Sequence, residues 1–141
     1  MPRKIIKNFL AIMITKNFAS HEFACRCGSD TCDAPAIKKE LVRHIQELRD
    51  EIGKPIYITN GVRCKPYNED LARRGYRVAP DSPHLYGLAA DITTHDFQKD
   101  RDTLRELIDK FGRFTGVGVY SKHLHVDIKD RGTKEQVVWV S

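Results

Sequence analysis

The sequence lacks any long apolar run. No stretch reaches the ~18 to 20 apolar residues that a membrane-spanning helix needs, so we expect no transmembrane helix. The N-terminal segment has an early basic pair, but Lys7 and Asn8 interrupt its apolar part and no small-x-small cleavage site follows. We therefore expect synthesis in the cytoplasm without a clear signal peptide. Met13 is an alternative start, which would make residues 1–12 an N-terminal extension of a domain over residues 13–141.

Repeats, low-complexity tracts and linkers are also absent. The chain of 141 residues therefore fits one domain, which is long enough to bury a hydrophobic core without disulfides. Acidic residues are in the minority, with 19 Asp and Glu against 24 Lys and Arg, and the formal net charge is +5. This excess favours a polyanionic partner, such as nucleic acid or an anionic bacterial wall. Because the basic residues are scattered and no nucleic-acid motif is present, we expect no nucleic-acid partner and no membrane partner.

Cysteine is scarce, and three of the four cysteines lie close together. Cys25, Cys27 and Cys32 share one short segment, and Cys64 follows much later. The spacing is not the paired Cys-x-x-Cys of a zinc ribbon. Three interpretations stay open, namely free or packed thiols, a disulfide, and a small second metal site. A reducing compartment would argue against the disulfide.

Hydrophobic periodicity predicts a mixed fold. A helix is expected from Pro35, capped by Thr31 or Asp33, with an apolar face that continues to Ile52 and an end at Gly53. The other patterns predict helices at 66–74 and 99–111 and strands at 56–59, 88–93, 116–120, 124–128 and 137–140. Helices and strands in this order indicate an α+β domain in which helices flank an antiparallel sheet.

The first candidate for chemistry is an aspartate inside an apolar strand. Asp91 stands between Ala90 and Ile92, shortly after the loop that carries His84. A buried carboxylate needs a partner, because burying it charged and alone costs several kcal/mol or shifts its pKa. A metal ion, an arginine or a set of backbone donors would each serve.

A second group of polar residues follows in the segment 122–128. With the period of two expected for a strand, His123, His125 and Asp127 face one way and the apolar residues between them face the core. A solvated strand face is the alternative. Together with His84 and Asp91, however, His125 completes the two imidazoles and one carboxylate of a catalytic zinc site, which leaves a fourth position for water. His123 is then placed to act as a base, and Asp127 either shares in catalysis or orients an imidazole.

These motifs resemble the zinc D-Ala-D-Ala carboxypeptidases of the peptidase M15 family, together with their phage endolysin endopeptidase relatives. The resemblance spans roughly residues 17–130 and rests on the joint pattern of Ser82, His84, Gly87, Ala89, Asp91, His123 and His125. It implies the small α+β fold shared with the hedgehog domain, and it implies Zn²⁺ as the cofactor.

The resemblance also implies roles for single residues. His84, Asp91 and His125 match the zinc ligands, Arg63 matches an arginine that stabilises the substrate or an oxyanion, and Ser82 matches a residue near the substrate. A surface ion pair is the alternative for Arg63, and a turn residue is the alternative for Ser82.

One position departs from the family pattern. Many members carry an acid three residues before the last ligand histidine, where this chain has Lys122, so His123 is the substitute base. The resemblance implies a zinc peptidase that acts on bacterial peptidoglycan peptide at the cell wall, as a carboxypeptidase or an endopeptidase. A monomer is expected as the default for a small hydrolase. A non-catalytic zinc-binding module is the second hypothesis, favoured by Lys122, and a metal-dependent nuclease or nucleic-acid binder is the third.

Overall fold

The computed structural model describes residues 12–141, so the expectations about residues 1–11 lie outside the described part of the chain. The helices of this part are α2 (Lys39–Ile52), α3 (Lys65–Arg73) and α4 (Phe97–Phe111), with 3₁₀ turns η1 (Ser20–Phe23) and η2 (Pro83–Tyr86). The strands are β1 (Tyr57–Asn60), β2 (Ala89–Thr93), β3 (Gly116–Val119), β4 (Leu124–Asp127) and β5 (Val137–Val140). The α+β class predicted from the sequence is confirmed.

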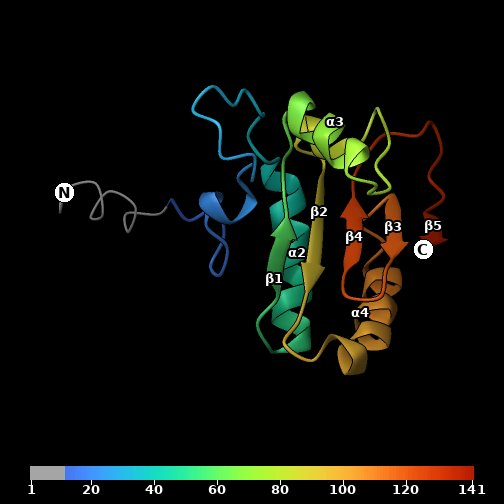
Figure 1. The fold of residues 1–141 in the computed structure, drawn as a ribbon. Helices are drawn as coiled ribbons and strands as arrows, with labels where there is room; N and C mark the ends of the chain where they lie inside the picture. The colour runs from blue at the N-terminus through green and yellow to red at the C-terminus, as the bar shows by residue number, and fades with distance from the viewer. Residues whose placement is uncertain (1–11) are drawn as a thin grey trace.

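The strands form one sheet in the order β1-β2-β4-β3-β5 (Figure 1). All neighbouring pairs are antiparallel except β3 and β5, which run parallel, so the expectation of an antiparallel sheet holds for all strands but the last. The chain leaves β4 at the end of the sheet where β3 begins, because Asp127 pairs with Gly116. It therefore enters β5 from that same end, and β5 must run with β3.

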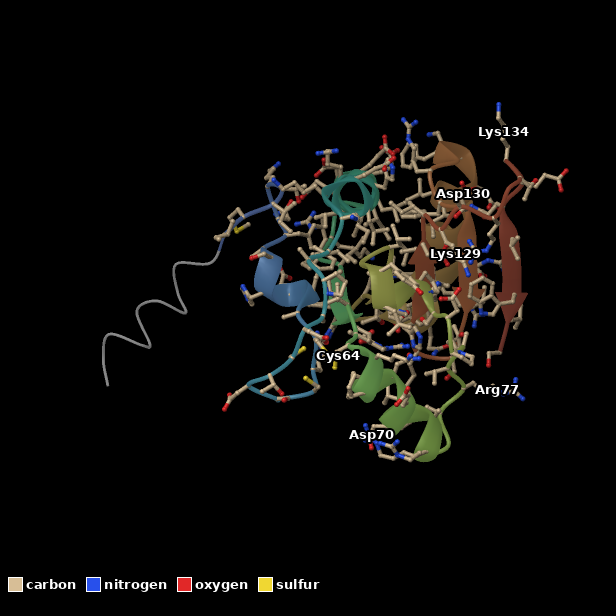
Figure 2. The ribbon with its side chains drawn as sticks, turned by 90° about the horizontal axis from the view of Figure 1, so that it is seen from above. Cys64, Asp70, Arg77, Lys129, Asp130 and Lys134 are labelled. Atoms are coloured by element: carbon tan, nitrogen blue, oxygen red, sulfur yellow. The ribbon has the colours of Figure 1, made fainter. Side chains whose placement is uncertain are left out.

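Helices α2 and α4 cover one face of the sheet, and α3 lies on the other side (Figures 1 and 2). Their apolar faces and the inward side chains of the strands make the core, whose fully buried members include Leu41, Ile45, Leu48, Ile92, Leu104, Ile108 and Leu124. Burial of this apolar surface is the main force that holds the helices to the sheet. The helices thus bury one face of the sheet, and the opposite face is open to a ligand.

The start of α2 differs from the sequence prediction. The helix begins at Lys39 rather than Pro35, and neither Thr31 nor Asp33 caps it. Lys38 is extended, and its backbone N–H donates to the carbonyl of Gly87 at 2.9 Å. This long-range bond holds the chain before α2 against the loop that precedes β2, and it outweighs the local helix signals. The predicted end is correct, because Gly53 adopts the left-handed conformation there (φ 71°).

No helix in the described range 12–141 has the length and apolar character that crossing a bilayer demands.

Candidate metal centre and cleft

His84 is placed by the 3₁₀ turn η2. Ser82 begins this turn, and its Oγ accepts a hydrogen bond from the backbone N–H of His84 at 3.3 Å. The imidazole is buried, and its Nδ1 lies 2.6 Å from the carbonyl oxygen of Gly61. A carbonyl can only accept, so Nδ1 carries the proton and Nε2 keeps a free lone pair.

Asp91 and His125 are brought together by the pairing of β2 with β4, where they are direct cross-strand partners. Asp91 Oδ1 lies 3.3 Å from His84 Nε2 and 3.3 Å from His125 Nδ1. The three ligand atoms all lie within 4.8 Å of one another. The structure therefore collects, from three separate segments, the three residues that the sequence predicted as zinc ligands.

The donor set fits a metal ion. Asp91 Oδ1 is buried and has no hydrogen-bond partner, which would be costly for a carboxylate oxygen without a cation beside it. Burial alone would raise the pKa of Asp91, but the imidazoles of His84 and His125 outweigh it and hold the pKa below its ordinary value. Two imidazole nitrogens and one carboxylate oxygen match the three protein ligands of a catalytic zinc site.

Asp127 lies behind His125 rather than beside the metal position. It is fully buried, and its Oδ2 is 2.7 Å from His125 Nε2. Arg131 donates to Oδ1 at 2.6 Å and to Oδ2 at 3.0 Å. Burial would raise the pKa of Asp127, but its bonds to His125 and Arg131 lower it. A carboxylate kept charged in this way accepts the Nε2 proton of His125 and leaves Nδ1 free for a metal.

His123 lies at the open side of the metal position. Its Nε2 is 3.8 Å from Asp91 Oδ2, and its ring stacks on Tyr120 with the centroids 4.5 Å apart. Burial lowers its pKa, so at neutral pH the imidazole is neutral and can accept a proton. Lys122, in contrast, is exposed on the turn before β4, where its carbonyl accepts a bond from Thr93.

Arg63 is buried at the edge of the same site. Its guanidinium lies 4.0 Å from Asp91 Oδ2 and donates to Asn68 Oδ1 at 3.1 Å. With the oxygen of the Asn60 amide turned toward it, the guanidinium also donates to Asn60 at 2.6 and 3.0 Å. Burial lowers the pKa of Arg63, and the charge of Asp91 opposes this shift. These amide contacts hold the cation in one position, which a surface ion pair would not do.

A cleft of about 810 Å³ lies over these residues, and His84, Asp91, His123 and His125 line its floor. The cleft is strongly basic. Its lining includes the cations Arg26, Arg63, Arg74, Arg77, Lys129 and Arg131, whereas Asp81 and Asp91 are the side-chain carboxylates among its described lining residues. Such a cleft attracts a ligand that carries carboxylates. Ser82 also lines it, although the Ser82 hydroxyl already caps the turn of His84.

Several residues that build the site were not predicted from the sequence. The ring of Trp139 on β5 lies 5.1 Å from that of His125, and its Nε1 donates to the Tyr120 hydroxyl at 3.1 Å. Arg131 and the pair Asn60 and Asn68 were also missed. Asn60 was predicted only as half of an Asn-Gly turn. Arg131 lies four residues after Asp127, and Asn68 lies five residues after Arg63, so a short window of sequence contained both pairs. The contact of Trp139 with His125, in contrast, depends on how β5 packs.

Comparison with known protein families gives one match. The model of the family described as Peptidase M15 matches residues 16–128 of the chain. No curated protein matches the sequence. The matched range contains the three candidate metal ligands and ends just after β4, so Arg131 and Trp139 lie beyond it.

Proposed function

The chain belongs to the peptidase M15 family, and from this premise we propose that it is a zinc-dependent peptidase that hydrolyses peptidoglycan stem peptides. The observation that carries the proposal is the buried convergence of His84 Nε2, Asp91 Oδ1 and His125 Nδ1 at the floor of a basic cleft. An unpartnered carboxylate oxygen between two imidazoles is the arrangement that a metal ion would stabilise.

Zn²⁺ would be held by His84, Asp91 and His125. Bound zinc supplies a water of lowered pKa and polarises a carbonyl. The protein prepares this position in advance, because Gly61 and Asp127 occupy the second nitrogen of each imidazole and so fix which nitrogen faces the metal.

Two further side chains act on the substrate in this proposal. His123, neutral and facing the cleft, accepts a proton from the attacking water and later delivers it to the leaving amine. Arg63 is fixed by amide oxygens beside Asp91, where it would stabilise the negative charge that develops on the carbonyl oxygen, or hold a substrate carboxylate.

The basic lining of the cleft favours peptidoglycan stem peptide among peptide substrates. Stem peptides carry free carboxylates, and Arg77 in the cleft lining offers a cation for them, as does Lys129, whose Nζ lies 3.9 Å from Asp81 Oδ2. The chain would cut either the D-Ala-D-Ala end or an internal bond of this peptide, and so would act at the bacterial cell wall.

The test is the digestion of purified peptidoglycan, with the released fragments identified by mass spectrometry. We expect fragments from the wild type, none in the presence of a chelator, and recovery after zinc is added back. His84→Ala should lose about 100-fold or more of the rate, since metal chemistry supplies several kcal/mol of the barrier reduction. His44→Ala is the matched control, because His44 lies on helix α2, behind the sheet. This variant should retain the bound zinc and digest peptidoglycan at the wild-type rate.

A non-catalytic zinc-binding module is the second candidate. It is favoured by Lys122, which stands where many members of the family carry an acid. Release of no fragments by a protein that carries zinc at His84, Asp91 and His125 would replace the peptidase with this module. Digestion that continues without any metal would overturn the zinc mechanism itself.

A further inference from the structure

We propose that Cys25, Cys27, Cys32 and Cys64 form a second metal site, a closed structural Zn²⁺ centre separate from the cleft. The four sulfur atoms all lie within 4.8 Å of one another, and the four cysteines are free thiols. Of the three interpretations that the sequence left open, a second metal site is the one that uses all four residues at once.

The spacing of the sulfur atoms suits a tetrahedral ion. Zinc–sulfur bonds of about 2.3 Å place the corners of a tetrahedron about 3.8 Å apart. Cys25 Sγ lies 3.8 Å from Cys64 Sγ, although 39 positions separate these residues in the sequence. A disulfide requires an S–S distance of about 2.05 Å, whereas Cys25 Sγ and Cys64 Sγ are 3.8 Å apart, the separation expected for two ligands of one zinc ion.

The backbone around the cluster is shaped to support thiolates. Gly28 adopts the left-handed conformation (φ 71°), which turns the chain sharply after Cys27. The N–H of Ser29 then donates to Cys27 Sγ at 3.4 Å, and the N–H of Cys64 donates to Cys25 Sγ at 3.4 Å. Backbone donors of this kind stabilise the negative charge of ligating sulfurs and orient them.

The site would join two distant parts of the chain. Cys64 is the residue before α3, and Figure 2 shows it facing the loop that follows η1, with further sulfur atoms beside it. Cys64 also follows Arg63, which lines the cleft, so zinc at this point would tether the loop 24–34 to the segment that carries the candidate oxyanion residue. On binding, each thiol that ligates the zinc releases its proton, and no oxidation takes place.

Structural zinc sites have four protein ligands and no open position. The cysteine cluster therefore holds its ion for stability, whereas the cleft site with three ligands keeps a place for water. The two sites differ in ligand chemistry, so they can be told apart in the same molecule.

The experiment is to measure zinc per chain and the absorption of cobalt-substituted protein, using the full-length chain purified under reducing conditions. We expect two zinc ions per chain in the wild type and one in His84→Ala. The double variant Cys27→Ser/Cys32→Ser, on the more exposed side of the cluster, should also keep one. With cobalt, the thiolate-to-metal charge-transfer band should be present in the wild type and in His84→Ala and absent in the double variant.

Asp30→Asn, in the same exposed loop, is the control and should keep both metals and the charge-transfer band. One zinc per chain in the wild type, lost in His84→Ala, together with no thiolate band, would overturn the cysteine site and leave the cleft site intact. Iron in place of zinc at the cysteines, or a mass loss showing disulfides in protein purified without reductant, would also overturn it.

Discussion

The two histidines of the candidate metal site present different nitrogen atoms to the position that a metal would occupy. His84 uses Nε2, because Nδ1 donates to the carbonyl of Gly61, and His125 uses Nδ1, because Nε2 donates to Asp127. Each choice follows from a hydrogen bond on the far side of the ring. The chemistry of the site is therefore set as much by these partners as by the ligands.

Asp127 provides the first test of this arrangement. Asp127→Asn removes the charge that His125 and Arg131 share, and we expect zinc affinity at the cleft to fall by about 10- to 100-fold. Zinc titration against a competing chelator measures it. Asp130→Asn, an exposed neighbour, should leave the affinity unchanged. Equal affinities in the two variants would show that Asp127 serves packing alone.

His123 provides the second test, of catalysis without metal binding. Its Nε2 lies 3.8 Å from Asp91 Oδ2, beyond hydrogen-bond distance. His123→Ala should retain the zinc and lose about 10²- to 10⁴-fold in kcat, as expected for the loss of a general base. Parallel zinc analysis and peptide turnover separate the two effects. An unchanged kcat would reassign the base to another residue of the cleft.

At the scale of elements, β3 makes room for the site by having glycine at alternate positions. Gly116 pairs with Asp127, and Gly118 pairs with His125. A Cβ atom at Gly116 would collide with the carboxylate of Asp127 and with Arg131, and one at Gly118 would collide with the ring of Trp139. Glycine weakens a strand, so its presence at these two positions is explained by the space that the partners of His125 need.

A single methyl group at Gly116 should therefore affect both the stability of the fold and zinc binding at the cleft. Gly116→Ala should displace the carboxylate of Asp127, lowering the free energy of unfolding by about 1 to 3 kcal/mol and weakening zinc binding at the cleft. Urea unfolding and zinc titration measure the two effects. Val140→Ala on the neighbouring β5, whose side chain is 76% exposed, is the control and should change neither.

At the scale of the whole molecule, a half-buried ion pair links the two helices that cover the sheet. Asp100 on α4 accepts a hydrogen bond from Lys54, just beyond the end of α2, at 2.8 Å and another from Thr94 at 2.7 Å. These bonds lower the pKa of Asp100. The folded state therefore favours the charged carboxylate more than the unfolded chain does.

The stability from this pair should depend on pH in one direction. It is fully present above the ordinary aspartate pKa of about 4 and is lost as the pH falls through the lowered pKa of Asp100. Asp100→Asn should unfold at lower urea than the wild type at pH 7, and the difference should shrink as the pH falls below 4. Asp102→Asn, with a side chain 81% exposed, should match the wild type throughout.

Local patterns in the sequence determined most of the elements and the identity of the candidate ligands. The period of the apolar residues predicted the helices and strands, because burial imposes that period on any chain that packs one face. Residue type at His84, Asp91 and His125 pointed to zinc, since two imidazoles and one carboxylate are a ligand set of catalytic zinc sites.

Tertiary structure decided what depends on partners distant along the chain. The extended segment before α2, the parallel direction of β5, and the contact of Trp139 with His125 each depend on a bond or packing contact made across the fold. The same is true of Cys64, whose sulfur meets the other three only after folding. Such contacts are absent from any short window of sequence, because the free energy that forms them arises only when separate segments are brought together.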